Sequence, residues 1–315
     1  MPILLSGSIA YDYIMDFPDS FKNHILPDQI HILSVAFAVE KMQKNYGGTA
    51  ANIAYSIKLL GGDPLIFAPI GSDGKEYLEY FKNFGIDTDY ISPSKDLLTS
   101  SAHIITDKDD NQITAFYAGA GIEADKLDVN NIKKDIKIAL ICAAKQTAMI
   151  AHAKQCFDLK IPICFDPGQQ ITALSPQEVA AILGQSKFLI VNDYEMKLVQ
   201  EKTGWDGEEL LNHVEVLITT LGSKGSVIRT KNEIFEIAAC PPQSVDDPTG
   251  AGDAYRSGFF TGYVRGFDYK TCGQMGSVAA TYAVEKYGTQ NHKFTIEEFE
   301  KRYKNTYSQT LSLKT

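Results

Sequence analysis

Several common chemical signatures are missing from this 315-residue chain, and each absence excludes a class of protein. The five cysteines are odd in number and scattered, with no C-x-x-C pair, which argues against a disulfide framework and a zinc site. No apolar run reaches the roughly 18 residues of a membrane span, and the apolar N-terminus has no basic leader region. We therefore expect a cytoplasmic protein.

Positive charge is also scarce. The chain carries 30 basic and 39 acidic residues, a formal net charge of −9, and no long run of lysine or arginine. A field of this sign repels nucleic acid and anionic membranes, so we expect neither as a partner and favour a small molecule. A nucleotide remains compatible with this charge where its phosphates meet local backbone amides and a cation.

The two standard nucleotide-binding loops are absent. The chain contains no G-x-x-x-x-G-K-[ST] and no G-x-G-x-x-G after its first strand. This weakens both a P-loop NTPase and a dinucleotide-binding oxidoreductase as interpretations.

Short β-rich runs alternate with helical segments through much of the chain. Strands are expected at residues 3–10, 137–144, 161–168, 187–195 and 214–222, and helices at 147–159, 175–185 and 194–204. This alternation predicts an α/β fold with a doubly wound, mostly parallel sheet flanked by helices. Residues that follow such strands meet at one edge, where we expect Asp12, Asp166, Asn192 and Thr220.

Two segments, at approximately residues 13–46 and 99–118, alternate instead like antiparallel strands, with a hairpin turn at 108–112. They predict a small β-sheet lid over the crevice. The alternative is a simple edge extension or a dimerisation surface. Phe37, Phe116 and Tyr117 lie in these segments and could sandwich a purine or form the core of the small sheet.

The stretch "DDPTGAGDAYRSGFF", residues 246–260, places glycines directly before an apolar helical run. The first amides of a helix lack partners within it, and Gly250 and Gly252 allow a close approach, so this turn predicts an anion site. Asp253 lies in the first helical turn, where we expect the helix field to favour its ionised form, ready to accept a proton. The alternative is that Asp253 only caps the helix.

These motifs resemble a known family. "DPTGAGDAYRSGFF" is similar to the C-terminal signature of the PfkB family of sugar and nucleoside kinases, and "GGTAANIAYSIKLLGG", residues 47–62, to its N-terminal signature. "NDYE" and "TTLGSKG" match further family motifs, so the resemblance covers nearly the whole chain. It implies one ribokinase-like kinase domain over residues 1–315, with the lid segments inserted in it.

The resemblance also implies roles for single residues in phosphoryl transfer. Asp253 would be the catalytic base, and the amides of Gly250, Ala251 and Gly252 an anion hole. Asn192 and Glu195 would organise Mg²⁺ through water, although Asn192 could simply cap a helix.

For ATP and a monovalent cation, the implied residues lie on two loops. Thr220, Gly222 and Gly225 match positions that contact ATP, and Lys224 is either a phosphate neighbour or a solvated loop lysine. Asp247 and the loop around Gly288 match the region that binds K⁺ in many relatives.

The acceptor site follows from the same resemblance. Asp12 would accept hydrogen bonds from two sugar hydroxyls, and Gly47, Gly48 and Asn52 would cradle the sugar. Thr49 stands where ribokinase carries a lysine, which favours a larger acceptor.

We therefore expect ATP-dependent phosphorylation of adenosine to AMP. Some relatives place an arginine in the lid over the phosphates, but the comparable turn here is Asp110, Asn111 and Gln112, so Mg²⁺, Lys224 or Arg256 would have to compensate. The alternatives are a kinase of inosine, guanosine or a free sugar, a non-catalytic nucleoside sensor, and an oxidoreductase. A homodimer through the lid stays open.

Overall fold

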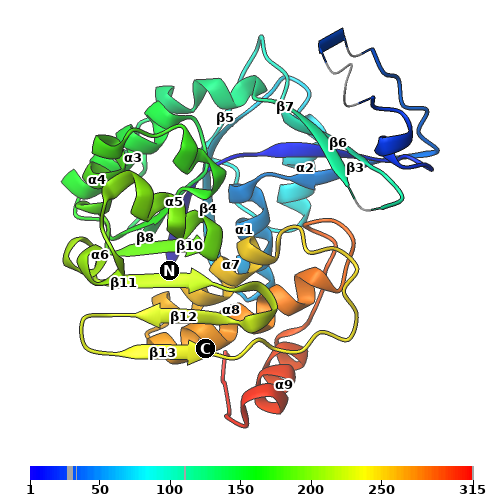
Figure 1. Cartoon of the computed structure of the whole chain (residues 1–315). Coiled ribbons are helices and arrows are strands. Elements are labelled where there is room, and N and C mark those ends of the chain that lie inside the picture. The colour runs from blue at the N-terminus through cyan, green and yellow to red at the C-terminus, as the bar shows by residue number, and fades with distance from the viewer. Residues whose placement is uncertain (27–30, 33, 110, 314–315) are drawn as a thin grey trace.

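A computed structural model describes residues 1–26, 31–32, 34–109 and 111–313, and its centre is a large, mostly parallel sheet (Figure 1). The strand order is β13-β12-β11-β10-β9-β8-β1-β4-β5. All neighbours from β5 to β11 pair in parallel, whereas β12 and β13 are antiparallel. The strands are β1 (Pro2–Ser6), β4 (Asp63–Ile70), β5 (Ile91–Pro93), β8 (Ile138–Cys142), β9 (Ile163–Asp166), β10 (Phe188–Asn192), β11 (Val216–Thr220), β12 (Ser226–Arg229) and β13 (Ile234–Ile237).

Helices cover both faces of this sheet, which confirms the predicted fold class. Successive residues of β1 point to opposite faces: Ile3 and Leu5 join one apolar core, and Leu4 joins the other. On the first face lie α1 (Thr49–Leu59), α2 (Lys75–Asn83), α7 (Ala251–Val264) and α8 (Tyr269–Val284). On the second lie α3 (Gln146–Asp158), α4 (Pro176–Leu183), α5 (Asp193–Thr203) and α6 (Gly207–His213).

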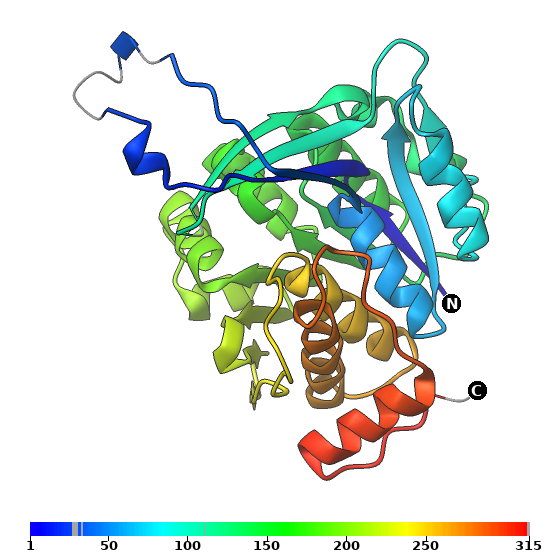
Figure 2. The ribbon, with the colours of Figure 1, turned by 90° about the vertical axis from the view of Figure 1, so that its right-hand side faces the viewer.

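The last helix, α9 (Ile296–Tyr307), packs on α8 at the end of the molecule that carries the C-terminus (Figure 2). No helix within the described ranges has the length and apolarity that crossing a lipid bilayer would need.

The carboxyl ends of β9, β10 and β11 place Asp166, Asn192 and Thr220 along one edge, as predicted. The prediction was wrong for Asp12. The first strand ends at Ser6, and Asp12 lies in a strand of a second sheet. The chain bends at Gly7, where a Cβ atom would lie 2.8 Å from the Thr49 Oγ1, so the close approach of α1 ends the strand early.

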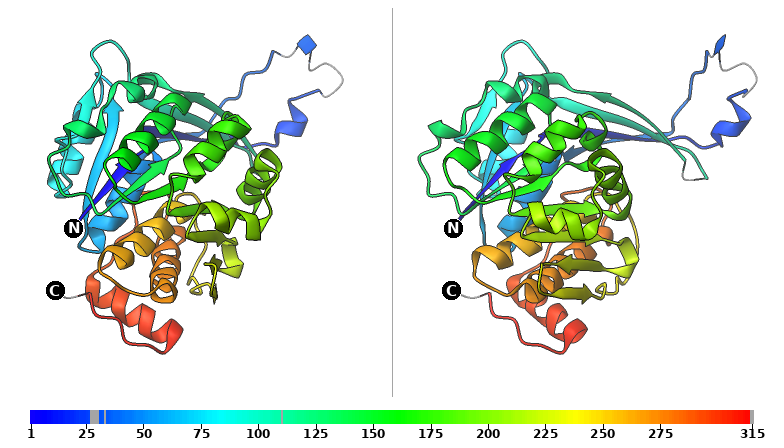
Figure 3. Two further views of the ribbon diagram at one scale, coloured as in Figure 1. Left: turned by 90° about the vertical axis from the view of Figure 1, so that its left-hand side faces the viewer. Right: turned by 60° about the vertical axis from the view of Figure 1, so that its left-hand side comes forward.

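The second sheet is small and has the order β3-β2-β6-β7. Its strands are β2 (Ala10–Asp16), β3 (Lys41–Gly47), β6 (Ser100–Thr106) and β7 (Gln112–Tyr117), so β2 begins three residues before the predicted segment. Asp110 of the predicted hairpin turn lies outside the described residues. Figure 3 shows this sheet projecting from the α/β body, with residues 17–26 at its far end.

An aromatic cluster between the large sheet and α7 should hold much of the fold's stability. Phe259 is fully buried, with ring centroids 5.0 Å from Phe260 and 6.1 Å from Phe188. Phe259→Ala should lower the free energy of unfolding by about 3–5 kcal/mol in urea titrations, because it leaves a cavity. Phe157→Ala removes a ring that is 52% exposed on α3 and should cost less than about 1 kcal/mol. Equal losses in the free energy of unfolding would show that the cluster stabilises the fold no more than an exposed ring does.

Candidate active site

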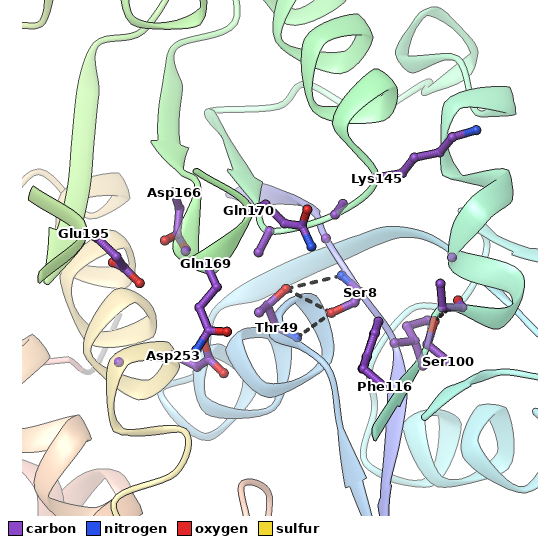
Figure 4. A pocket seen from close by; sticks show the side chains of 18 of the residues that line it. Ser8, Thr49, Ser100, Phe116, Lys145, Asp166, Gln169, Gln170, Glu195 and Asp253 are labelled. Atoms are coloured by element: carbon purple, nitrogen blue, oxygen red, sulfur yellow. Dashed lines mark hydrogen bonds between the residues drawn. The ribbon is translucent and has the colours of Figure 1, made fainter. Parts of the chain in front are cut away.

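A cleft of about 1260 Å³ lies between the carboxyl edge of the large sheet and the small sheet, and Figure 4 shows side chains that line it. The small sheet contributes Ser100, Thr114 and Phe116 to its wall, and the strand ends and α7 contribute the opposite wall. The cleft brings together these residues from the predicted site: Asn192, Glu195, Thr220, Gly222, Gly250, Gly252 and Asp253.

The glycine turn before α7 presents unpaired backbone amides. Gly250 precedes the helix with a φ of 80°, a left-handed conformation that favours glycine. The amides of Gly250, Gly252 and Asp253 have no hydrogen-bond partner among the described residues, and Ala251 N only reaches Pro248 O at 3.3 Å. This turn can therefore donate several hydrogen bonds to an anion in the cleft.

Asp253 does not cap its helix, since its side chain bonds to no amide of the first turn. Its Oδ2 instead accepts a hydrogen bond of 2.9 Å from the Asn52 Nδ2. Burial raises the pKa of Asp253 to about 7, against the opposing effects of Arg256 and Asn52. The sequence led us to expect that the helix field would favour the ionised form, but burial shifts the pKa of Asp253 in the opposite direction. A carboxyl that titrates near neutrality suits a general base.

Arg256 forms a buried ion pair with Asp166 directly behind Asp253. Its Nε and Nη2 each donate to one carboxylate oxygen of Asp166 at 2.5 Å, and both side chains are less than a tenth exposed. This bidentate geometry fixes the guanidinium in place. Arg256 is therefore already neutralised by the protein.

The cleft offers no unpaired cationic side chain within the part of the chain that is described. Lys145 also lines it but donates to Asp125 at 2.6 Å and points away from the centre (Figure 4). Lys224 is exposed and does not line the cleft. The unpaired backbone amides of the glycine turn are therefore the groups of this cleft that can meet negative charge on a ligand.

Asn192 and Glu195 form a reciprocal cap at the start of α5. The Asn192 side chain accepts from Glu195 N at 2.7 Å, and Glu195 Oε2 accepts from Asn192 N at 2.9 Å. The capping alternative for Asn192 is thus realised. Burial raises the pKa of Glu195. Its second oxygen is unused by this cap and remains available to a ligand in the cleft.

A magnesium ion fits this site only with help from a ligand. Within the described ranges, no three or more His, Cys, Asp or Glu side chains group to hold a metal. Mg²⁺ normally keeps several waters and takes one or two carboxylates together with phosphate oxygens. Glu195 and Asn192 satisfy that smaller requirement.

The loop after β11 is shaped by one glycine. Gly225 has a φ of 91°, and a Cβ atom there would lie 1.9 Å from the carbonyl oxygen of Ile237. Only glycine fits this position, which explains part of the "TTLGSKG" pattern sterically. Thr220 and Gly222, which precede it, line the cleft, whereas Gly225 does not.

On the acceptor side, Asp12 lies against the backbone of Gly47, where a Cβ atom would meet its Oδ2 at 2.2 Å. Burial, and then the charge of Asp247, raises the pKa of Asp12 to about 6. Its carboxylate has no hydrogen-bond partner in the described parts of the chain and is free to accept from a ligand. Gly48, with a φ of 94°, is the N-cap residue directly before α1 and is packed against Ser8 and Ala10.

Asp247 acts as a link between two loops and does not line the cleft. Its carboxylate accepts from Thr249 N at 2.9 Å and from Gly288 N at 3.0 Å. The two segments for which the family resemblance implies a K⁺ site are therefore brought together.

The three aromatic residues of the predicted lid lie in three different environments in the structure. Phe116, which is 62% exposed, projects into the cleft from β7. Phe37 lies between β2 and β3, where it is half-buried and packs against Phe17 and Phe21 with ring centroids 4.9 and 5.0 Å apart. Tyr117 is 44% exposed and lies outside the cleft lining.

Sequence reasoning missed several cleft residues. Gln169 and Gln170 follow β9, and Ser8 bonds to the start of α1 through Thr49 N at 3.0 Å. Figure 4 shows Gln169 extending toward Asp253. The string "FDPGQQ" at the end of a predicted strand was the only signal for the two glutamines.

Comparison with known proteins gives one consistent result. The pattern of the pfkB family carbohydrate kinases matches residues 22–295. A nucleoside kinase of Methanocaldococcus jannaschii is 34% identical over 301 residues, which cover 94% of each chain. The structure of Burkholderia thailandensis nucleoside kinase with inosine superposes with a TM-score of 0.90 at 34% identity, over 98% of this chain and 99% of that one. Its complex with ADP and inosine gives 0.87 at 35% identity, over 98% and 97%.

The Asp166–Arg256 pair should contribute to stability far more than a surface pair. Arg256→Met should lower the free energy of unfolding by about 3–5 kcal/mol, because Asp166 is left as an unpaired buried charge. Lys154→Met breaks the exposed pair with Asp158 and should change it by less than about 0.5 kcal/mol. Urea titration at pH 7 measures the free energy of unfolding of both variants. Similar changes in the two would contradict a larger contribution from the buried pair.

Proposed function

Because the chain belongs to the pfkB family of carbohydrate kinases, we propose that it transfers the γ-phosphoryl group of ATP to the 5′-hydroxyl of a nucleoside. The family resemblance of the two glycine motifs is confirmed, and the chain is a phosphotransferase that acts on a hydroxyl group. One observation carries the proposal: a carboxylate with a pKa near neutrality lies beside unpaired amides and faces the cleft.

In the proposed reaction, the 5′-oxygen attacks the γ-phosphorus while Asp253 accepts the hydroxyl proton. The bond from the γ-phosphorus to the β–γ bridging oxygen breaks, and ADP leaves with that electron pair. The amides of Gly250, Ala251 and Gly252 would stabilise the charge on the transferred group. Thr220, Gly222 and Gly225, with Lys224 at the loop surface, would flank the ATP phosphates and ribose.

Metal ions would supply the positive charge that the cleft lacks. Bound Mg²⁺ neutralises phosphate charge, and Asn192 and Glu195 would hold it, largely through water. Asp247 and the adjoining Gly288 loop would border a K⁺ ion.

For the acceptor, we propose a purine nucleoside. Asp12 would accept hydrogen bonds from the sugar diol, and Gly47, Gly48 and Asn52 would shape the surrounding wall. Adenosine is the first candidate from the sequence, and AMP its product, as in purine salvage. Inosine is the second, because the Burkholderia relative was solved with inosine.

The small sheet is proposed to act as a lid that excludes water from phosphoryl transfer. Phe116 at the cleft wall supports this role. The same sheet leaves Met42, Ile113 and Tyr117 between 40% and 64% exposed, and a homodimer through this face would cover them.

An acceptor panel tests this proposal directly. Purified protein with Mg²⁺-ATP should release ADP fastest with adenosine or inosine, and at least about tenfold more slowly with the 2′- or 3′-deoxy analogues, which leave Asp12 without a partner. Ribose and fructose should be poorer still. ADP release measured by a coupled assay decides the order, and a preference for a free sugar over every nucleoside would overturn the proposal.

Asp253→Asn should lower kcat by about 10³-fold or more, because the base is lost, and leave the KM for ATP within about twofold. In the wild type, kcat/KM should fall about tenfold per pH unit below pH about 7, since protonated Asp253 cannot accept a proton. Asp268→Asn is the matched control, because Asp268 is an exposed cap of α8. Full turnover by Asp253→Asn would remove Asp253 from the base role.

A further inference from the structure

A continuous chain of buried hydrogen bonds runs from the backbone of Gly47 to Asp253. The Tyr77 hydroxyl donates to Gly47 O at 2.8 Å, and the Gln290 Nε2 donates to the Tyr77 oxygen at 2.7 Å. The same Gln290 nitrogen donates to the Asn52 Oδ1 at 2.9 Å, and the Asn52 Nδ2 donates to the Asp253 Oδ2 at 2.9 Å. Four separate segments of the chain are thereby joined.

The carbonyl oxygen of Gly47, at the start of this series of hydrogen bonds, sets the donor and the acceptor of every bond that follows. A backbone carbonyl can only accept, so the Tyr77 proton must point to Gly47. The Tyr77 oxygen must then accept, which turns the nitrogen of the Gln290 amide toward it. That nitrogen in turn requires the oxygen of Asn52, so the Asn52 nitrogen faces Asp253.

Burial keeps this arrangement from being replaced by water. Tyr77, Gln290 and Asn52 are 0%, 5% and 6% exposed. Burial also raises the pKa of Tyr77 well above its usual value, so its hydroxyl keeps the proton that it donates. The Gln290 Oε1 is buried and without a partner in the described structure, so the amide is held through its nitrogen alone.

We propose that Gln290 and Tyr77 are positioning residues for the reaction, which orient Asn52 so that the Asp253 Oδ2 is committed as an acceptor and Oδ1 takes the substrate proton. This inference rests on the proposed role of Asp253 as the base. It also assigns Asn52, placed in the sugar cradle by its motif, a direct contact with the base.

The charged surroundings of Asp253 make the effect measurable. Arg256 faces it from its own helix, Asp166 from β9, Asp12 from β2 and the Cys142 thiol from β8. Among the described residues, the Gln290 side chain bonds to Asn52 and Tyr77 and to none of these groups, so its replacement leaves them in place. Loss of the Asn52 N–H would remove an interaction that lowers the pKa of Asp253, so that pKa would rise.

Gln290→Met preserves the side-chain length and removes the amide. The acid limb, meaning the fall of kcat/KM on the acidic side of its pH profile, should move to a pH about one unit higher. At pH 7, kcat should fall roughly tenfold, and the KM for ATP should stay within about twofold of wild type. Gln274→Met is the matched control. Gln274 is 4% exposed and accepts from the Tyr303 hydroxyl at 2.5 Å, outside the cleft lining. It should leave the acid limb where the wild type has it.

Tyr77→Phe keeps the buried ring and removes only the group that sets the direction of the chain. The Gln290 amide can then turn over, so the acid limb should move in the same direction by a smaller amount, with kcat about threefold lower. Tyr303→Phe is its control. If circular dichroism shows that Gln290→Met is unfolded, the pH profile and kcat of Tyr77→Phe alone test the proposed positioning roles.

Wild-type acid limbs and kcat values in the folded Gln290 and Tyr77 variants would overturn the inference. Asp253→Asn, measured in parallel, separates this failure from that of the proposed function. An inactive Asp253→Asn with normal Gln290→Met would sink only the positioning roles, whereas an active Asp253→Asn would sink both.

Discussion

The contact between the first turns of α1 and α7 is the constraint on which the site depends. It brings Asn52 to Asp253 across 201 residues of sequence, and it is reinforced one turn later where the Ser257 hydroxyl donates to Ile53 O at 3.0 Å. On its other side, α7 lies so close to α8 that a Cβ atom on Gly258 would meet Met275 O at 2.5 Å. The base is thus held by a helix that is packed tightly on two sides.

The electrostatics of the cleft follow from this placement. Asp253, Asp166 and Glu195 line the same cleft, while the described cations that line it are already paired with carboxylates. A triphosphate cannot be attracted by such a wall through side-chain charge. In the proposed reaction, backbone amides and a metal ion bound with the nucleotide would instead meet the phosphate charge, in keeping with the acidic balance of the whole chain.

Much of the fold could be predicted from local patterns, because alternating apolar strands and helices have short periods that a sequence displays directly. The turn before Asp253 was predictable for a similar reason, since clustered glycines before a helix have few uses. The position of Asp12 was not, because the bend at Gly7 depends on how closely α1 approaches. The roles of Gln290 and Tyr77, and the pairing of Arg256 with Asp166, depend on long-range contacts of polar residues that show no local periodicity.

The two carboxylates that would handle the acceptor belong to different parts of the molecule. Asp12 lies within β2 of the small sheet, which Figure 3 shows reaching out from the body, whereas Asp253 is anchored on the body itself. Any rotation of the small sheet relative to the body therefore changes the gap between the group that holds the sugar and the group that takes its proton. In the proposed reaction, closure of the small sheet over a bound acceptor would therefore also set the distance from the sugar to the base.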